Sequence, residues 1–277
     1  MNKKLVFFDI DGTLAMPTHP VSPAVADAIR RLRANGHMAF LGTGRAEAIV
    51  PPEIKAIGFD GGIYSAGGRT AVGGHEVSSH AMSEEMTRRI IDILSREDML
   101  FYVLETATGN ICGNSDVSFD NLDFRGGSTE LLRVQQIFTQ GSQKKAEDYD
   151  GEPVYKVSYF CAPKERMDRL EKTLSELGKV VRFDNMVPDS PLFSGEITSE
   201  GTDKGRALTD ICHYCGADPA DSIAFGDSMN DVEMLTAAGI GVAMGNSEPR
   251  VKELADRICE TCDEDGVVHE LERMGLI

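Results

Sequence analysis

The sequence predicts an α/β protein in which a core with a parallel sheet is interrupted by an inserted α+β domain. Short apolar runs alternate with helical patterns toward both ends of the chain, which is typical of parallel strands joined by crossover helices. These runs lack a strict alternation with polar residues, as expected where helices cover both faces of a sheet. The middle of the chain combines amphipathic helices with alternating stretches, which favours a separate antiparallel sheet.

Residues 1–81 and 191–277 are predicted to form the core. Its expected strands, several of which run into turns, are LVFF (5–8), HMAFLGTGR (37–45), DGGIYSAGG (60–68), SIAFGDS (222–228), IGVAMGNS (240–247) and RICET (257–261). Its expected helices cover 21–36, 202–216, 230–239 and 248–255. The first helix has Ser22 at its N-cap and Gly36 just past its end, the positions that these residue types prefer.

Residues 82–190 are predicted to form the inserted domain. Its helical patterns are MSEEMTRRIIDILSRE (82–97) and PKERMDRLEKTLSELG (163–178), and its alternating stretches include YKVSYF (155–160) and VVRF (180–183). Helices and strands in this order indicate an α+β domain. The polar stretch VPDSPLFSG (187–195), which contains proline, is interpreted as the hinge through which the chain returns to the core.

Composition and charge exclude several classes of function. The chain of 277 residues is 41% hydrophobic and 26% charged, and no apolar stretch reaches the ~20 residues of a membrane span. The first residues lack the long apolar segment of a signal peptide, so we expect a cytoplasmic protein. The formal net charge of −17 disfavours nucleic acid and anionic membranes as partners. A small anionic substrate stays compatible, because a bound metal ion can invert the local field.

The six cysteines include two C-x-x-C pairs, CHYC (212–215) and CETC (259–262). Such pairs can form a zinc site with four thiolates. The stretch between the pairs is longer than in a compact zinc ribbon, and each pair falls in predicted regular structure. We therefore interpret them as ordinary reduced cysteines, and whether the pairs bind anything is left open.

Polar residues follow the predicted core strands at the edge of the sheet where open α/β folds bind ligands. They are Asp9 and Asp11, then Thr43, Gly44 and Arg45, then Asp227, Ser228, Asn230 and Asp231, with Lys204 at the start of the helix before the 222–228 strand. A buried carboxylate is costly unless something pairs with it. Asp9 and Asp227 can chelate a hard cation such as Mg²⁺, which would neutralise the clustered acids.

The same residues suit the transfer of a phosphoryl group to a carboxylate. Asp9 can attack phosphorus as a nucleophile, and Asp11 can protonate the leaving oxygen and later activate water. Thr43 and Lys204 can hold the transferring oxygens. For Arg45, a contact with substrate and a structural ion pair are both open.

Each of these elements also has a purely structural interpretation. The D-x-D-G stretch can be an acidic turn, although an EF-hand is excluded because Leu14 and Pro20 stand where that loop requires Gly and Glu. The residues from Thr43 can form a plain turn, Lys204 can be a solvated helix residue, and Asp227 can cap the next helix. Four such elements in order, each at a predicted strand or helix end, favour a functional site.

The segments DIDGT (9–13), TGR (43–45), DKG (203–205) and GDSMND (226–231) resemble, in this order, the four motifs of the haloacid dehalogenase-like (HAD) superfamily. SIAFGDSMNDVEML, GIGVAMGNS and CDEDGV are similar to its Cof-type branch, which is rich in sugar-phosphate phosphatases. The resemblance covers about residues 1–80 and 191–277 and implies a Rossmann-like core with a C2-type cap domain. Ser65-Ala66-Gly67-Gly68 departs from the S-N-G-A of many relatives, which bears on substrate rather than catalysis.

The resemblance also implies a role for each motif residue. Asp9 would be the nucleophile and Asp11 the acid/base. Mg²⁺ would be bound by Asp9, the main-chain carbonyl of Asp11 and Asp227, with Asp231 supporting these ligands. The residues implied to contact phosphate are Ile10, through its main chain, and Thr43, Gly44, Lys204 and Asn230.

The expected function is therefore the Mg²⁺-dependent hydrolysis of small phosphomonoesters, with sugar phosphates as the leading class, through an aspartyl-phosphate. The inserted domain would close over the site and exclude water. Two alternatives stay open: a phosphotransferase or phosphomutase acting on phosphosugars, and a non-catalytic module that binds phosphosugars. The expected partner is a small phosphorylated metabolite, and the chain is expected to be a monomer or a weak homodimer.

Overall fold

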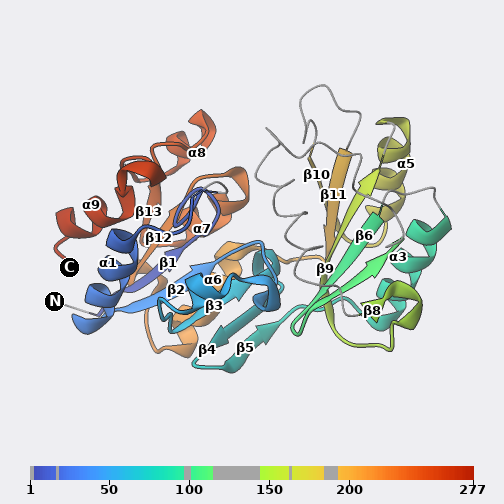
Figure 1. Cartoon of the computed structure of the whole chain (residues 1–277), viewed down its shortest axis with the longest axis horizontal. Helices are drawn as coiled ribbons and strands as arrows, with labels where there is room; N and C mark the ends of the chain where they lie inside the picture. Colours follow the sequence, from blue (N-terminus) through green and yellow to red (C-terminus); the bar gives the residue numbers. More distant parts are fainter. Residues whose placement is uncertain (1–2, 17–18, 97–100, 115–143, 162–163, 184–192) are drawn as a thin grey trace. The chain divides into compact units, whose positions relative to one another are not determined.

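The computed structural model describes residues 3–16, 19–96, 101–114, 144–161, 164–183 and 193–277 (Figure 1). The chain divides into two compact units. The first consists of Met1–Arg45, Val50–Ser79 and Thr202–Ile277, and the second of Ala46–Ile49 and His80–Gly201. Each unit has its own sheet, so the predicted α/β fold with an inserted α+β domain is confirmed.

The first unit is built on a sheet with the strand order β14-β13-β12-β1-β2-β3-β4-β5 in the described part of the chain. Its strands are β1 (Leu5–Phe8), β2 (Met38–Gly42), β3 (Gly61–Tyr64), β4 (Arg69–Val72), β5 (His75–Ser79), β12 (Ser222–Gly226), β13 (Ile240–Ala243) and β14 (Arg257–Ile258). Neighbouring strands from β14 to β3 are parallel, and β4 and β5 are antiparallel. The carboxyl ends of β1, β2 and β12 therefore meet at one edge of the sheet.

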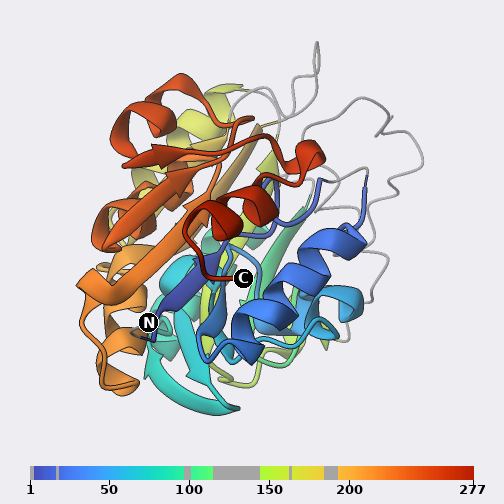
Figure 2. The same ribbon diagram turned by 90° about the vertical axis from the view of Figure 1, so that its left-hand side faces the viewer.

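Helices cover both faces of this sheet. They are α1 (Pro23–Ala34), α2 (Pro52–Lys55), α6 (Lys204–Tyr214), α7 (Val232–Ala237), α8 (Pro249–Leu254) and α9 (Gly266–Arg273). Successive side chains of β1 enter different apolar clusters: Val6 packs with residues of α1 and α9, whereas Phe7 packs with residues of α6, α7 and α8. Figure 2 shows α9 (red) beside α1 (blue). This two-sided burial is the physical reason for strands without polar alternation.

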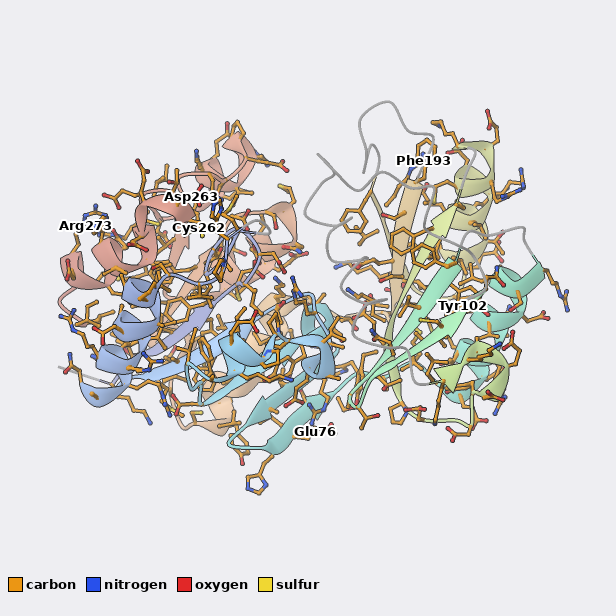
Figure 3. The ribbon with its side chains drawn as sticks, viewed as in Figure 1. Glu76, Tyr102, Phe193, Cys262, Asp263 and Arg273 are labelled. Carbon is orange, nitrogen blue, oxygen red and sulfur yellow. The ribbon has the colours of Figure 1, made fainter. Side chains whose placement is uncertain are left out.

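The second unit combines a mostly antiparallel sheet with two helices, α3 (Glu84–Arg96) and α5 (Lys164–Leu174), in the residues that the structure describes. In the sheet order, the strands are β10 (Lys179–Phe183), β11 (Phe193–Thr198), β9 (Val154–Cys161), β6 (Phe101–Thr106), β7 (Asn110–Gly113) and β8 (Lys144–Lys145). Apolar side chains of the sheet and both helices form one cluster, which includes Tyr102 (Figure 3). The Tyr102 hydroxyl lies 2.7 Å from Ser95 Oγ, so its polar end is satisfied.

The return of the chain to the first unit comes after β11 rather than before it. The predicted boundary between 190 and 191 placed β11 in the core, but β11 pairs with β9 and β10 in the second sheet. The predicted hinge at 187–195 lies largely outside the described residues, and its described end belongs to β11. Among the helices that the structure describes, none combines the length and apolar character of a membrane span.

Candidate active site

The loop after β1 turns sharply at the carboxyl edge of the sheet. The main-chain N–H of Asp9 donates to the carbonyl of Phe225 at 3.0 Å, which continues the pairing of β1 with β12. Gly12 has a φ of +94°, and a Cβ atom there would lie 2.2 Å from Asp227 Oδ2. Glycine therefore lets this loop take its left-handed turn and lie against Asp227.

Three carboxylates and one ammonium group form the centre of the site. Oxygens of Asp9, Asp227 and Asp231 lie within 4.8 Å of one another. Lys204 Nζ, at the first turn of α6, donates to Asp9 Oδ1 at 2.9 Å and to Asp231 Oδ1 at 2.6 Å. Lys204 is 1% exposed and Asp9 is 4% exposed. The cluster thus crowds three acidic groups around one ammonium group in a space with little access to water.

Burial and crowding shift the pKa values of Asp9, Asp227 and Lys204. Burial raises the pKa of Asp9 to about 7, and the negative charge of Asp231 adds to the effect. Burial, followed by the charge of Asp9, raises the pKa of Asp227 to about 8. Burial opposes the charge on Lys204, but the carboxylates of Asp231 and Asp9 raise its pKa. At neutral pH, the carboxylates therefore favour either a proton or a further positive charge beside them.

The donor set of the cluster fits a hard divalent cation. Asp227 Oδ1 is buried and has no hydrogen-bond partner among the described residues. Both oxygens of Asp231 are occupied, Oδ1 by Lys204 and Oδ2 by the main-chain N–H groups of Asp227 and Ser228, each at 3.1 Å. Asp231 therefore holds the loop in place, whereas Asp9 and Asp227 offer the carboxylate oxygens that Mg²⁺ prefers.

Two of the residues predicted to contact phosphate, Thr43 and Asn230, lie in the segments that follow β2 and β12. Thr43 follows β2, and its Oγ1 accepts a hydrogen bond from the main-chain N–H of Arg45 at 3.1 Å. Asn230 is exposed in the short 3₁₀ helix Met229–Asp231, where its Oδ1 accepts from Ser228 Oγ at 2.8 Å. Lys204 is in direct contact with the carboxylates, whereas these hydrogen bonds of Thr43 and Asn230 remain within their own loops.

Asp11 and Arg45 form an ion pair beside the cluster. Arg45 Nε donates to Asp11 Oδ2 at 2.9 Å, and Arg45 Nη2 donates to Asp11 Oδ1 at 2.7 Å. The Arg45 side chain is 7% exposed and that of Asp11 is 30% exposed. Of the two interpretations that the sequence leaves open for Arg45, this structure shows the ion pair.

Asn246 is a residue of the site that the sequence did not point to. Its Nδ2 donates to the carbonyl of Gly12 at 2.9 Å, and its Oδ1 accepts from the main-chain N–H of Cys262 at 2.9 Å. The side chain therefore ties the loop after β1 to the segment after β14. The sequence offers a Gly-Asn-Ser turn after β13 and the likeness of GIGVAMGNS to the Cof-type branch, neither of which assigns a role to the Asn246 side chain.

The cysteine thiols are absent from the acidic cluster that could hold a metal ion in the described residues. All six are free thiols, and among the described residues no cysteine joins a cluster with the spacing of metal ligands. Burial raises the pKa of Cys212 to about 11, and that of Cys259 and Cys262 to about 12. Thiols with such a raised pKa are protonated at neutral pH.

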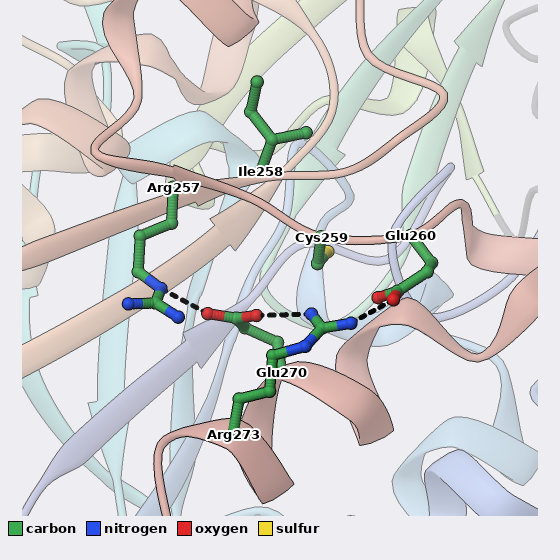
Figure 4. Close-up of a pocket in the computed structure, with 6 residues that line it drawn as sticks. All are labelled: Arg257, Ile258, Cys259, Glu260, Glu270 and Arg273. Carbon is green, nitrogen blue, oxygen red and sulfur yellow. Dashed lines mark hydrogen bonds and ion pairs between the residues drawn. The ribbon is translucent and has the colours of Figure 1, made fainter.

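A pocket of about 380 Å³ lies at β14 and α9 (Figure 4). It is lined by Arg257, Ile258, Cys259, Glu260, Glu270 and Arg273. Glu270 accepts hydrogen bonds from both Arg257 and Arg273, and Arg273 also pairs with Glu260. Because each guanidinium group is already paired with a carboxylate, this pocket is a weaker candidate for an active site than the acidic cluster at the sheet edge.

The chain is similar to proteins of one family along nearly its whole length. A family model described as haloacid dehalogenase-like hydrolase matches residues 6–271. Phosphatase YwpJ of Bacillus subtilis is 28% identical over 98% of this chain and 99% of its own. The HMP-PP phosphatase of Escherichia coli O157:H7 is 28% identical over 90% of this chain and 86% of its own.

The fold of the chain is also similar to the folds of solved structures. A haloacid dehalogenase-like hydrolase from Bacillus subtilis has a TM-score of 0.77 and 25% identity, and the match covers 98% of this chain and 99% of that chain. The sugar phosphatase BT4131, of HAD subclass IIB, has a TM-score of 0.77 and 23% identity, with 99% and 100% covered. The second likeness bears on the fold alone.

Proposed function

The chain belongs to the haloacid dehalogenase-like hydrolases and is a phosphoric monoester hydrolase of that family, and we propose that it hydrolyses small phosphomonoesters through an aspartyl-phosphate on Asp9. The observation that carries this proposal is the buried cluster of Asp9, Asp227 and Asp231 with Lys204 across it. One oxygen of Asp9 is held by Lys204, which fixes the carboxylate and leaves the other oxygen for attack on phosphorus.

In the first step, a carboxylate oxygen of Asp9 forms a bond to phosphorus while the bond from phosphorus to the leaving oxygen breaks. Asp11 gives its proton to that oxygen, so the product leaves as an alcohol. In the second step, water attacks the same phosphorus, Asp11 takes a proton from the water, and the Asp9 carboxylate is released together with phosphate. Lys204, Thr43 and the main-chain N–H groups of the loops bind the phosphate oxygens.

Mg²⁺ is proposed as the cofactor, held by Asp9, the main-chain carbonyl of Asp11 and Asp227. When bound, it would supply positive charge that screens the phosphate from the carboxylate that attacks it. Asp231 would keep the loop of Asp227 in position through the hydrogen bonds of its Oδ2. The proposal is supported by the crowding of the three carboxylates and by the buried Asp227 Oδ1, which has no hydrogen-bond partner among the described residues.

Sugar phosphates are proposed as the leading substrate class. The resemblance of the sequence to the Cof-type branch supports this choice. Relatives named as HMP-PP phosphatases make organic pyrophosphates a second class to test. Location in the cytoplasm and a monomeric or weakly dimeric state stay predictions from the sequence.

The test is the release of inorganic phosphate from sugar phosphates, pyridoxal phosphate, flavin mononucleotide and an organic pyrophosphate, with Mg²⁺ or with EDTA. We expect release by the wild-type protein with Mg²⁺ and none by Asp9→Asn. Asp221→Asn is the matched control, because Asp221 forms a half-exposed ion pair with Lys4 away from the site. Absence of release from every compound would overturn the proposal and favour a transferase or a binding module. Undiminished release by Asp9→Asn would overturn the role of Asp9 as the nucleophile.

A further inference from the structure

We propose that the turn Ser65–Gly67, which follows β3, is a positioning element that fixes Lys204 relative to Thr43 for binding of the transferring phosphoryl group. This inference rests on the proposed function, in which both residues hold phosphate oxygens. The two residues belong to different elements, since Thr43 follows β2 and Lys204 begins α6. Their separation therefore depends on what connects these elements at the edge of the sheet.

The turn has an unfavourable main-chain conformation. Ser65, Ala66 and Gly67 have φ values of +48°, +57° and +100°, which makes three left-handed residues in succession. Glycine adopts this region readily, whereas a Cβ atom disfavours it in serine and alanine. Such a conformation persists only where the surrounding contacts maintain it, and it is found mainly at functional sites.

On one side, the turn is bound to the segment after β2. The N–H of Ser65 donates to the carbonyl of Arg45 at 2.9 Å, and the N–H of Ala66 donates to the carbonyl of Thr43 at 3.2 Å. The N–H of Thr43 donates to the carbonyl of Ile63 in β3 at 2.9 Å. Successive N–H groups of an extended strand point in opposite directions. The left-handed turn is therefore what lets two successive N–H groups bind the same segment.

On the other side, the turn lies against the main chain that precedes Lys204. A Cβ atom on Gly67 would lie 2.3 Å from the carbonyl oxygen of Asp203, so glycine is needed for this close approach. Asp203 caps α6, because its Oδ1 accepts from the N–H of Arg206 at 2.6 Å. A shift of the turn would therefore move the start of the helix and, with it, Lys204.

The start of α6 has little room to move away from the turn. Gly205 lies against α7, where a Cβ atom would be 2.3 Å from the carbonyl oxygen of Glu233. Lys204 thus lies between two close main-chain contacts, one at the residue before it and one at the residue after it. These contacts fix the origin of the side chain whose ammonium group donates to Asp9 and Asp231.

A turn that only joins β3 to β4 would have a different consequence. A substitution in it would lower the free energy of unfolding and the amount of folded protein, but the folded protein would bind ligands as before. A positioning role instead changes an inhibition constant, which does not depend on the amount of active protein. The inhibition constant therefore separates the two roles.

The experiment measures the inhibition constant of orthovanadate during the release of phosphate from the best substrate of the panel with Mg²⁺. Vanadate can take the five-coordinate geometry of the transition state, which an enzyme binds more tightly than its substrate. Gly67→Ala places a Cβ atom inside the contact with Asp203, and a displacement of about 1 Å can cost about 10²-fold in rate. We expect the inhibition constant to rise at least about tenfold and kcat to fall, with a smaller change in KM.

Ala66→Val is the second variant. A β-branched residue is strongly disfavoured in the left-handed region, so this substitution strains the turn without the clash at Asp203. We expect the inhibition constant of vanadate to rise severalfold. Circular dichroism establishes that each variant is folded, and Ala66→Val keeps the comparison decisive if Gly67→Ala does not fold.

Gly239→Ala is the matched control. A Cβ atom there would lie 2.1 Å from the carbonyl oxygen of Ala220, which is as close a main-chain contact as that of Gly67. Gly239 immediately precedes β13, so this contact lies at the opposite edge of the sheet from the acidic cluster. Urea unfolding should show a loss of stability in Gly239→Ala, but the inhibition constant should stay at the wild-type value.

An unchanged inhibition constant in the folded variants of the turn, or an equal rise in Gly239→Ala, would overturn the inference. A wild-type protein that releases phosphate but is not inhibited by vanadate would do the same, because Thr43 and Lys204 would then not be placed for five-coordinate phosphorus. If the wild-type protein releases no phosphate from any compound, the proposed function fails and this inference falls with it. If release depends on Asp9 but is equally sensitive to vanadate in every variant, only this inference fails.

Discussion

Without a divalent cation, the protein is expected to become less stable as the pH rises from about 5.5 to 7. Burial and neighbouring charge raise the pKa of Asp9 from 3.8 to about 7 and that of Asp227 from 3.8 to about 8. Between these values, the folded chain binds protons at the two carboxyls that the unfolded chain has released. The stability that they contribute is complete below the unfolded pKa and is lost as the pH rises through the folded pKa.

The expected size follows from this proton balance. One such carboxyl changes the free energy of unfolding by about 1.4 kcal/mol per pH unit. One to two carboxyls therefore predict a decline of about 1.4 to 2.7 kcal/mol per pH unit in this range. Surface carboxylates with a lowered pKa, such as Asp168 and Glu264, contribute to the stability of the fold and lose that contribution only at a pH below this range. Burial lowers the pKa of His37, which makes the protein more stable as the pH rises and so opposes the effect of the two carboxyls. The slope of a variant that lacks one of the carboxyls must therefore be compared with that of the wild-type protein.

The assay is urea unfolding in EDTA at four pH values between 5.5 and 7, for the wild-type protein and Asp227→Asn. The amide of Asp227→Asn cannot titrate, so the free energy of unfolding of this variant should fall less steeply with pH, by about 1 kcal/mol per pH unit. Asp221→Asn should keep the slope of the wild-type protein. Added Mg²⁺ should stabilise the wild-type protein more at pH 7 than at pH 5.5, because it binds ionised carboxylates. A slope in EDTA that is equal in Asp227→Asn and the wild-type protein would refute this reasoning.

Three further substitutions test the local structure. Lys204→Met leaves buried carboxylates without their partner, and urea unfolding in EDTA should show a loss of about 3–5 kcal/mol, in contrast to a loss below about 1 kcal/mol for an exposed pair. Gly12→Ala places a Cβ atom 2.2 Å from Asp227 Oδ2, and calorimetric titration with Mg²⁺ should show an affinity at least about tenfold lower. Ala66 has a φ of +57°, so Ala66→Gly should raise the free energy of unfolding by up to about 1 kcal/mol and Ala66→Val should lower it. An unchanged urea midpoint in both Ala66 variants would contradict the assigned strain.

The sequence predicts much of the first unit because its signals are local. A short apolar run identifies β1, and the residues after each parallel strand must reach the same edge of the sheet. The sequence therefore predicts that Asp9, Asp227 and Lys204 lie near one another. In the structure, Asp9 forms a hydrogen bond with Lys204, and its carboxylate lies within ligand distance of Asp227. The N-cap of α1 is equally local, and Ser22 Oγ accepts from the N–H of Val25 at 3.1 Å.

Features that depend on distant partners could not be predicted. Nothing near Arg45 in the sequence shows that its side chain would pair with Asp11 rather than with substrate, because that choice depends on the fold of two separate loops. The place of β11 is a second case: its pairing with β9 and β10 decides which unit it joins. The prolines around residue 190 suggested a hinge instead. The role of Asn246 could not be predicted either, because its hydrogen-bond partners Gly12 and Cys262 are remote from it in the sequence.

The central claim, that Asp9 carries the phosphoryl group, can be tested by trapping the intermediate. The protein would be mixed with the best substrate of the panel and Mg²⁺, quenched with acid during turnover, and reduced with borohydride, which converts an aspartyl-phosphate to homoserine. Peptide mass spectrometry should then find homoserine at position 9 in the treated wild-type protein and in no sample without substrate. Homoserine at another aspartate, or rapid turnover with position 9 unmodified at every quench time, would contradict the account.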